Sequence, residues 1–453
     1  MQLHKTLLAC TAASALFAGS AVAQELVQPI GGDARFNWQS YQDFADKYDL
    51  TGQTLNIFGP WQTADKEGWE KVLAYFTEAT GATVANVGSS SFEQQIVIDV
   101  QAGSPPDIAI FPQPGLAADL ASRGQLTALD DATKQWLLDN YAAGQSWVDL
   151  STYKDASGNP QLFAFPWKAD LKSLVWYVPE NFEEAGYEIP QTMEELKALT
   201  EQIVADGGTP WCIGIGSEGA TGWPATDWVE DIMLRTQPPE VYDEWTTNAI
   251  PFTDPRVVAA IDEFGWFARN DKFVAGGAAA VGTTDFRDSP KGLFSSPPEC
   301  YMHRQASFIP AFFPEGTELG VDANFFYFPA FAEKDLGRPV LGGGTLFAIT
   351  KDTPAARAFI EFLKTPIASE IAMAEWNFYT PFSGVNLEAY NSDVQREQNK
   401  ILLDATTFRF DGSDLMPGRI GAGAFWTGMV DFVGGKDATA VATDVQNAWD
   451  AIK

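Results

Sequence analysis

The sequence predicts an α/β fold in which mostly parallel sheets are flanked by helices. Two apolar runs of strand length, residues 55–61 and 107–112, each contain a proline near their end, and helical patterns lie between and after them. Strands that alternate with helices of this length indicate βα units around a mostly parallel sheet. A composition of 45% hydrophobic and 20% charged residues indicates a large buried core.

The first helices follow these strands in order. Residues 65–80 form a helical pattern that ends before Gly81, a residue suited to a helix C-cap. Its apolar side chains share one face: Trp69, Val72, Leu73 and Phe76. Residues 92–103 predict a second helix, and residues 114–124 predict a third that ends at Gly124.

The same alternation returns later in the chain. Thr192 and Glu195 form a capping box at the start of a helix, and Thr353 with Pro354 starts another. A last helix over residues 436–453 places five side chains on one face: Val441, Val445, Ala448, Trp449 and Ile452. The length predicts two or three domains, and lobes that exchange strands would explain why no linker marks a boundary.

The N-terminal segment is typical of a secretory signal peptide. Lys5 precedes an apolar run from Leu7 to Val22, and small residues stand before Gln24. We expect residues 1–23 to be removed by cleavage near Ala23. A retained membrane span is disfavoured because Thr, Ser and Gly thin the apolar run. Cys10 comes too early in the run to be a lipoprotein site, so the mature chain is expected to be exported without membrane insertion.

The charge excludes two classes of partner. After the loss of Lys5 the mature chain has 28 Lys and Arg against 60 Asp and Glu, a net charge of −32. Such a chain attracts neither nucleic acid nor an anionic lipid surface. An acidic, solvated surface that keeps an exported protein soluble is the simpler reading.

Two cysteines, Cys212 and Cys300, remain in the mature chain. An even pair in an exported protein predicts one disulfide, with two buried thiols as the alternative. In the chain-entropy model, closing a loop of this length contributes about 4 to 5 kcal/mol.

The usual catalytic and metal-binding patterns are not found. His303 is the sole histidine of the mature chain, no G-x-S-x-G string accompanies it, and we expect it to be structural. The sequence GIGSEG at 214–219 matches the G-x-G-x-x-G pattern of dinucleotide-binding sites, which requires a helix directly after it. No helix is expected there; we expect a turn and then a helix that begins near Pro224. Asp411 and Asp414 do not fit a calcium loop. We therefore predict no catalytic residue, no metal site and no cofactor.

Aromatic residues accumulate instead at the ends of loops and strands, next to amide and charged side chains. Sugars have apolar C–H faces and rims of hydroxyl groups, so proteins hold them with aromatic platforms edged by such polar groups. The aromatic candidates are Trp61, Phe111, Trp167, Trp223, Trp228, Trp376 and Trp426. The polar candidates are Gln62, Gln113, Lys168, Asp170, Glu218, Asp227 and Arg304.

Six segments together resemble the solute-binding proteins of sugar ABC importers, the maltose-binding-protein superfamily, and most closely its alpha-glucoside-binding group. They are LNIFGPWQTADKEGW at 55–69, SPPDIAIFPQPG at 104–115, PWKADLKSLVWY at 166–177, WCIGIGSEGATGWPATDWVEDIMLR at 211–235, LGGGTLFAIT at 341–350 and SDLMPGRIGAGAFWTGM at 413–429. The resemblance implies the two-lobed class II periplasmic binding protein fold, with a ligand cleft between lobes that the chain connects three times. The expected lobes are 24–168 with 330–378, and 169–329 with 379–453.

The resemblance also implies the positions of the ligand-binding residues. Lobe 1 and the first crossing would contribute Trp61, Gln62, Phe111, Gln113, Trp167, Lys168 and Asp170. Lobe 2 would contribute Glu218, Thr221, Trp223, Arg304 and Trp426. Trp376 and Asp227 are further ligand-binding candidates from the aromatic and polar pattern. Gly343 and Gly344 would let backbone amides approach a hydroxyl. The sequence departs from maltose-binding protein itself where GPWQ and PQPG replace charged pairs of the family.

The function implied is a periplasmic receptor, monomeric and not an enzyme, that closes over an alpha-glucoside such as trehalose, maltose or sucrose and delivers it to the importer's permease subunits. A receptor for another small carbohydrate or polyol is the alternative within the binding class. An exported glycoside hydrolase is the alternative outside it and would need two facing carboxylates, for which Asp170 and Glu218 are the candidates.

Overall fold

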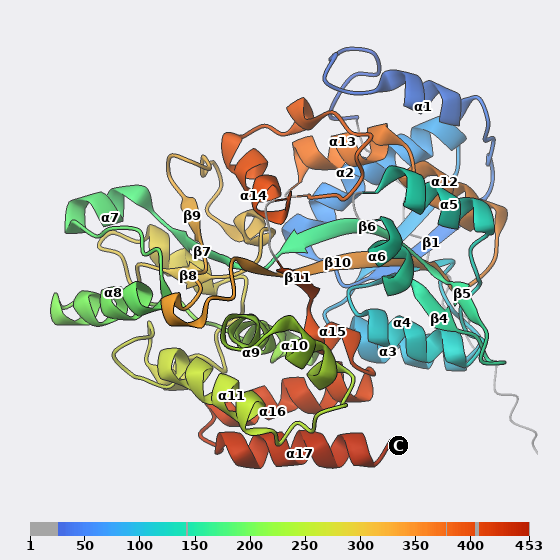
Figure 1. Ribbon diagram of the computed structural model, residues 1–453. Helices are drawn as coiled ribbons and strands as arrows, with labels where there is room; N and C mark the ends of the chain where they lie inside the picture. The colour runs from blue at the N-terminus through green and yellow to red at the C-terminus, as the bar shows by residue number, and fades with distance from the viewer. Residues whose placement is uncertain (1–25, 142–143, 377, 404–406, 453) are drawn as a thin grey trace, which may run out of the picture.

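The computed structural model describes residues 26–141, 144–376, 378–403 and 407–452, so the predicted signal peptide and Cys10 lie outside the described residues. Two groups of hydrophobic cores divide this part of the chain into two lobes (Figure 1). The cores of lobe 1 draw buried residues from 36–169 and 346–390. Those of lobe 2 draw buried residues from 171–341 and 416–449.

The large sheet is built around three parallel strands of lobe 1. Its order is β11-β10-β3-β1-β2, and β6 also pairs with β10. The strands are β1 (Thr54–Gly59), β2 (Thr83–Gly88), β3 (Ile108–Phe111), β6 (Ala164–Leu171), β10 (Pro339–Ile349) and β11 (Thr407–Phe410). A small hairpin of β4 (Thr152–Lys154) and β5 (Pro160–Leu162) lies beside it.

The α/β class is confirmed, but the sheets are mixed rather than mostly parallel. β1 pairs in parallel with β2 and β3, and β11 with β10, whereas β10 pairs antiparallel with both β3 and β6. The antiparallel pairs arise because β6 leaves lobe 1 and β10 returns to it, so the two strands run in opposite directions between the lobes.

Helices cover lobe 1 on both faces of the sheet. They are α1 (Trp38–Ala45), α2 (Thr63–Thr80), α3 (Phe92–Gln101), α4 (Pro114–Ser122), α5 (Asp131–Asn140), α6 (Gly144–Leu150), α12 (Pro354–Leu363) and α13 (Pro366–Glu375). The sequence expectations for α2 are confirmed: Trp69, Val72, Leu73 and Phe76 are buried, and Gly81 ends the helix in the left-handed conformation.

Lobe 2 has a three-stranded antiparallel sheet of order β8-β7-β9, covered by helices (Figure 1). Its strands are β7 (Leu174–Tyr177), β8 (His303–Arg304) and β9 (Asn324–Tyr327). Its helices are α7 (Pro179–Ala185), α8 (Met193–Ala205), α9 (Trp223–Thr236), α10 (Pro239–Thr246), α11 (Pro255–Ala268), α15 (Gly412–Leu415), α16 (Trp426–Val433) and α17 (Ala438–Asp450). The expected helix near Pro224 is α9.

The cap and face predictions of the later helices agree with the structure, with one exception. The capping box of Thr192 and Glu195 starts α8, and Thr353 caps α12. On α17, Val441, Val445 and Trp449 are buried, but the predicted face does not extend to Ile452. Ile452 is 37% exposed because the helix ends at Asp450, which frees the following residues from its periodicity.

The chain passes between the lobes along β6 and along β10. Tyr379, Phe382, Ala389 and Tyr390 pack in the core of lobe 1. We therefore propose that the third crossing follows Tyr390, through α14 (Asp393–Leu403), rather than residue 378.

The disulfide between Cys212 and Cys300 is confirmed, and both cysteines lie in a core of lobe 2. His303 lies beside it, where its Nδ1 is 2.8 Å from the carbonyl oxygen of Cys212. Burial lowers the pKa of His303 to about 4, which keeps the ring neutral.

Candidate functional site

A cavity of about 140 Å³ lies between the two lobes; we call it the lobe cavity. Its lining comes from both lobes and from the strands that join them: Pro60, Trp61, Asp65, Ser90, Glu93, Pro112, Gln113, Lys168, Asp170, Lys172, Ser217, Ala220, Trp223, Phe286, Arg287, Phe308, Gly344, Thr345, Asp411, Asp414 and Trp426. Pro60 and Pro112 directly follow the carboxyl ends of the parallel strands β1 and β3, the edge at which α/β sheets present ligand sites.

Aromatic rings form part of the wall. Trp61 meets Trp69 and Trp376 edge-on, with ring centroids 5.3 and 4.7 Å away, so its position is fixed by the lobe 1 core. From lobe 2, Trp223 packs edge-on against Phe286, with ring centroids 4.9 Å apart. Trp426 is 2% exposed. Rings held from opposite lobes can contact opposite faces of one ligand.

A charged group lies at the end of β6. Lys168 forms an ion pair with Asp170, and its Nζ lies 5.3 Å from the Trp376 ring centroid. Asp65 accepts a 3.0 Å hydrogen bond from Nε1 of Trp376. Burial raises the pKa of Asp65 to about 6, although the nearby Lys168 ammonium opposes the rise.

Lys172 is the centre of a second, deeper charged group. Its ammonium pairs with Asp227 at 2.9 Å and also with Asp411. Burial raises the pKa values of Asp227 and Glu230 well above the ordinary range. Burial acts in the same direction on Asp411, but the Lys172 charge and hydrogen bonds from Asp227 and Glu230 outweigh it, so the pKa of Asp411 is lowered.

The carboxylate oxygens of Asp227, Glu230 and Asp411 lie within 4.8 Å of one another, a spacing that a metal ion could use. Here the ammonium of Lys172 already pairs with two of these three side chains, Asp227 and Asp411. The cluster therefore holds Lys172 and Asp411 in place at the cavity wall.

Three buried polar atoms on the wall have no hydrogen-bond partner among the described residues: Glu93 Oε2, Gln113 Oε1 and Thr345 Oγ1. Glu93 and Gln113 are joined by a 3.0 Å hydrogen bond from Gln113 Nε2 to Glu93 Oε1. Burial raises the pKa of Glu93 to about 7. Buried polar groups are normally paired, so these three atoms of wall residues have hydrogen-bonding capacity that the described protein does not use.

Direct bonds join the lobes at the rim of the cavity. Ser90 of lobe 1 donates a hydrogen bond to the Glu218 carboxylate of lobe 2, and Gln94 donates to the carbonyl oxygen of Gly219 at 3.3 Å. The amide of Gly418 donates to Asp119 at 3.1 Å. The lobes are therefore closed over the cavity.

The structure brings seven of the sequence-predicted residues to the lobe cavity: Trp61, Gln113, Lys168, Asp170, Trp223, Gly344 and Trp426. Others lie just behind its wall. Asp227 holds Lys172, and a Cβ at Gly343 would meet Cε of Lys172 at 2.9 Å. Trp376 supports Trp61 and Asp65.

The remaining predicted residues do not line the cavity. Phe111 and Trp167 are fully buried in the lobe 1 cores, and Arg304 is buried in lobe 2, where it donates to Asp231 at 2.8 Å. Trp228 packs in the lobe 2 core against Phe264 and Phe267. Gln62 precedes α2, Thr221 closes the turn before α9, and Glu218 bonds to Ser90.

Sequence reasoning missed several wall residues: Asp65, Ser90, Glu93, Lys172, Ser217, Phe286, Arg287, Phe308, Thr345, Asp411 and Asp414. One signal was available. Phe286 and Arg287 are an aromatic and basic neighbour pair, like those used as candidates, and the Arg287 guanidinium lies 4.3 Å from the Phe286 ring centroid.

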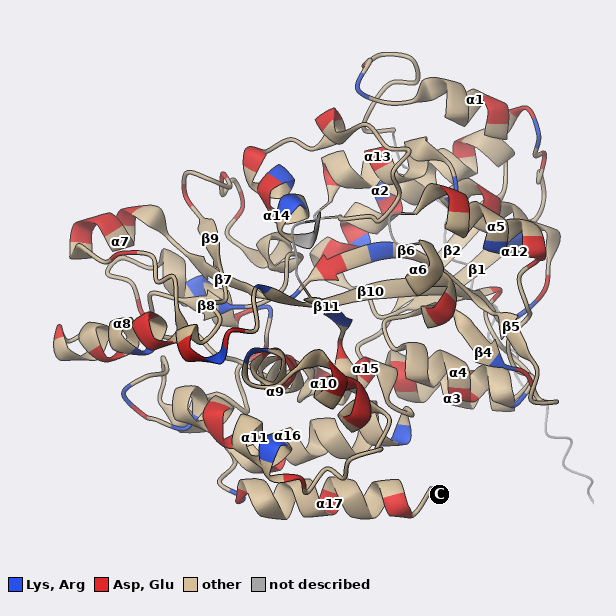
Figure 2. Cartoon of the chain, in the orientation of Figure 1, with Lys and Arg blue, Asp and Glu red and all other residues tan. Residues whose placement is uncertain are grey.

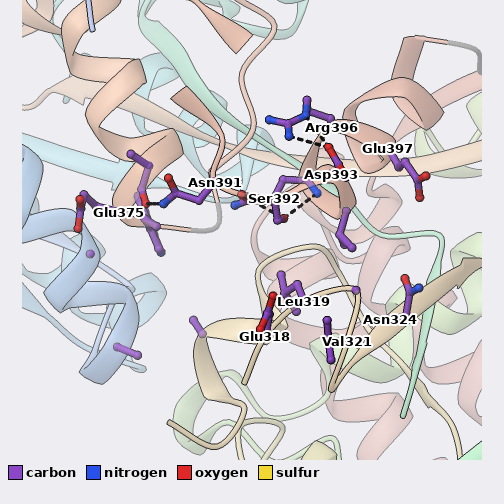
Figure 3. A pocket seen from close by; sticks show the side chains of 18 of the residues that line it. Glu318, Leu319, Val321, Asn324, Glu375, Asn391, Ser392, Asp393, Arg396 and Glu397 are labelled. Atoms are coloured by element: carbon purple, nitrogen blue, oxygen red, sulfur yellow. Dashed lines mark hydrogen bonds and ion pairs between the residues drawn. The ribbon is translucent and has the colours of Figure 1, made fainter. Parts of the chain in front are cut away.

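A second, larger cavity of about 880 Å³ lies along α14; we call it the α14 groove. Figure 3 shows Asn391 and Ser392 across the opening from Glu318, Leu319 and Val321. Trp376 lines the groove and Asp65 lines the lobe cavity, so this hydrogen-bonded pair stands between the two spaces.

Acidic residues are spread over the helices of both lobes (Figure 2). Across the described residues, none of the helices is long and apolar enough to cross a membrane.

Comparisons with known proteins place the chain in a family. The chain is 67% identical, over the full length of both proteins, to the "Alpha-glucosides-binding periplasmic protein AglE" of Rhizobium meliloti (strain 1021). It is 41% identical to the "Osmoprotective compounds-binding protein GgtB" of Synechocystis sp. (strain ATCC 27184 / PCC 6803 / Kazusa), over 88% of this chain and 93% of that protein.

The fold is shared with solved solute receptors. The receptor AcbH, whose structure is described as showing an exclusive preference for b-D-galactopyranose, aligns with a TM-score of 0.74 and 19% identity over 88% of this chain and 99% of its own. Residues 59–370 match the family described as bacterial extracellular solute-binding protein. With two lobes closed over a cavity, and with this match over most of its length, the chain belongs to the bacterial extracellular solute-binding protein family.

Proposed function

We propose that the protein is the periplasmic substrate-binding component of an ABC sugar importer, and that the lobe cavity binds an alpha-glucoside of the trehalose, maltose or sucrose type. The observation that carries the proposal is the set of unpartnered atoms on the cavity wall, Glu93 Oε2, Gln113 Oε1 and Thr345 Oγ1. The hydroxyl groups of a sugar can pair all three. The 67% identity to AglE supports the choice of alpha-glucosides.

The proposed ligand-binding residues are those that line the cavity. Trp61, Trp223 and Trp426 offer aromatic faces to the C–H surfaces of a pyranose ring. Lys168, Asp170 and Arg287 offer charged hydrogen-bonding groups to its hydroxyl rim. Because the wall comes from both lobes, a bound sugar would favour the closed state over an open one.

A smaller carbohydrate or polyol is the second candidate ligand class. The 140 Å³ cavity corresponds to about five water molecules at roughly 30 Å³ each. A disaccharide would need the lobes slightly further apart, whereas a smaller polyhydroxyl solute would not. The 41% identity to GgtB, named for osmoprotective compounds, also favours this class.

We propose no enzymatic activity. A glycoside hydrolase needs two carboxylates free to face a glycosidic bond. Asp170 is paired with Lys168, and Glu218 bonds to Ser90 at the rim outside the cavity lining. These contacts give both carboxylates a structural partner.

The remaining features of the proposal follow from the sequence and the family. Cleavage near Ala23 would release a monomeric receptor into the periplasm, and the permease subunits of an importer would receive the sugar. The absence of a cofactor and a metal remains part of the proposal.

A thermal-shift screen tests the ligand class. Trehalose, maltose and sucrose are added to the mature protein, with sorbitol as a polyol and sodium chloride at equal osmolality as a control. A ligand at 100 times its Kd stabilises the folded state by about 2.7 kcal/mol, which raises the melting temperature. We expect at least one alpha-glucoside to do this, with a micromolar or lower Kd by calorimetry. No shift with any sugar at 10 mM would overturn the proposal, and release of nitrophenol from a nitrophenyl glucoside would overturn the non-enzymatic part.

A further inference from the structure

We propose that Glu93 and Gln113 act as a joined pair of hydrogen-bond acceptors that recognises two hydroxyl groups of the ligand and so determines the specificity of the lobe cavity. This inference rests on the proposed sugar-binding function and assigns its selectivity to two named side chains. Glu93 belongs to α3 and Gln113 precedes α4, so the pair joins two elements of lobe 1.

The bond between the two side chains determines what they offer a ligand. Gln113 Nε2 donates to Glu93 Oε1 at 3.0 Å, and only the nitrogen end of the amide can donate to a carboxylate. The amide is therefore oriented with its oxygen away from Glu93. Gln113 Oε1 and Glu93 Oε2 remain, each without a partner among the described residues. Both are acceptors when Glu93 is ionised.

Packing holds the pair in a fixed position in the closed structure. Glu93 is 7% exposed and Gln113 is 4% exposed. The neighbouring Phe92 is fully buried, with its ring centroid 5.2 Å from that of Phe58 and 5.4 Å from that of Phe111. A site whose groups are already ordered loses little conformational entropy on binding and discriminates sharply between ligands.

The pair discriminates between ligands because a buried acceptor that receives no hydrogen bond is energetically unfavourable. A ligand without hydroxyl or amine donors, such as glycine betaine, would leave both oxygens buried and unpaired, which is unfavourable for each. The wall cations Lys168 and Lys172 are already paired with the acidic side chains of Asp170 and Asp411, so neither offers an unpaired charge to an anionic ligand. The arrangement therefore fits a neutral polyhydroxyl solute that presents two donors to one side of the cavity.

The test is a cycle between protein variants and ligand analogues, measured by calorimetry at pH 8 so that Glu93 is ionised. The ligand is whichever of trehalose, maltose, sucrose and methyl α-glucoside the wild type binds most tightly, together with its monodeoxy analogues. We expect the loss of either of two particular hydroxyls to weaken wild-type binding about tenfold to a hundredfold. In Gln113→Leu, the loss of affinity caused by removing one of these two hydroxyls should be less than threefold. In Glu93→Leu, the loss caused by removing the other hydroxyl should be less than threefold.

Controls separate recognition from folding. Gln95→Leu makes the same substitution on the exposed face of α3 and should leave every penalty unchanged. If a leucine variant fails to fold, Glu93→Gln keeps the side-chain shape. It should weaken parent-sugar binding at least fivefold while the melting temperature of the free protein at pH 8 does not fall, because the variant removes a buried charge.

The outcomes distinguish the inference from the function on which it rests. Failure of the wild type to bind any alpha-glucoside removes the proposed function. Wild-type binding with deoxy penalties that persist unchanged in both leucine variants overturns the acceptor pair alone. Binding of glycine betaine as tight as that of the sugar also overturns it.

Discussion

Trp426 is the first residue of α16, and its backbone and side chain have different tasks. Its carbonyl oxygen packs so close to Gly222, which has a φ of +117°, that a Cβ there would lie 2.3 Å from it. Its indole lines the lobe cavity, and Nε1 donates to Ser413 Oγ at 3.4 Å. The ring is thus anchored at one end and offers a face to the ligand.

We expect Trp426→Ala to weaken sugar binding at least roughly thirtyfold, because truncating a binding hot spot costs 2 kcal/mol or more and each 1.4 kcal/mol is tenfold. Calorimetry with the sugar found in the screen measures the loss. Trp449→Ala removes an equally large ring from the lobe 2 core outside the cavity, and it should lower the melting temperature while leaving the Kd unchanged. Unchanged affinity in Trp426→Ala would make Trp426 a core residue only.

Residue-level prediction could not tell apart neighbouring residues at and near the ends of strands. Gln113 comes after β3 and lines the cavity, whereas Phe111 is the last residue of β3 and is fully buried. Trp167 and Lys168 are neighbours on β6, yet only Lys168 reaches the cavity. A strand covered on both faces is apolar throughout, so sequence alone does not tell which neighbour faces a ligand.

At the scale of elements, the start of α4 in lobe 1 lies against the backbone at the end of α15, with no side chain between them. A Cβ on Gly115 of α4 would lie 1.8 Å from the carbonyl oxygen of Met416, which packs in the lobe 2 core. Backbone atoms cannot yield by that distance, so Gly115 is needed where the lobes meet.

We expect Gly115→Ala to hold the lobes apart and to weaken sugar binding at least tenfold, because the closed state required for binding becomes less populated. X-ray scattering at saturating sugar should give a larger radius of gyration than the wild type. Gly282→Ala is the matched control, since a Cβ there meets only Val433 at an ordinary 3.4 Å. A variant as compact and as tight-binding as the wild type would contradict this role.

Element prediction was strongest where local chemistry marks the ends. The capping box of α8, the Thr353 cap of α12 and the Gly81 end of α2 were all predicted and are all present. β2 was not predicted, because it is a short edge strand in which partly buried and exposed residues alternate. The antiparallel direction of β10 depends on contacts hundreds of residues apart, which no local pattern encodes.

At the scale of the whole molecule, buried ionisable groups make stability depend on pH. Burial raises the pKa of Glu93 from 4.5 to about 7, so the folded protein retains a proton that the unfolded chain releases. The free energy of unfolding contributed by this group therefore falls as pH rises from 4.5 through 7. His303 acts in the opposite direction, because its pKa is lowered to about 4.

We expect the difference in unfolding free energy between the wild type and Glu93→Gln to change by about 3 kcal/mol between pH 4.5 and 7.5, at roughly 1.36 kcal/mol per pKa unit. The wild type should lose stability relative to the variant as pH rises. Denaturant unfolding of the sugar-free proteins at several pH values measures the difference, and the comparison cancels the effect of His303. A difference that stays constant across this range would show that Glu93 is solvated.

The two-lobed architecture was predictable as a whole because its segments resemble a known family, although the composition gave only an α/β core. The cavity wall was predictable in part. Trp61, Trp223 and Trp426 were found as aromatic residues at loop and strand ends and from the family resemblance, while Asp411 and Asp414 were set aside as a failed calcium loop. Those two reach the cavity only because β11 returns beside β10, a pairing set by the tertiary fold.

The disulfide between Cys212 and Cys300 closes a loop of 88 residues entirely within lobe 2. No covalent bond of this kind therefore spans the strands on which the lobes would swing. Disulfide formation can stabilise lobe 2 during maturation, before any sugar binds, without restricting the movement of the two lobes relative to each other. Folding and sugar binding are therefore separate events. A reducing agent should shorten the lifetime of the folded protein more than it changes the Kd for the sugar.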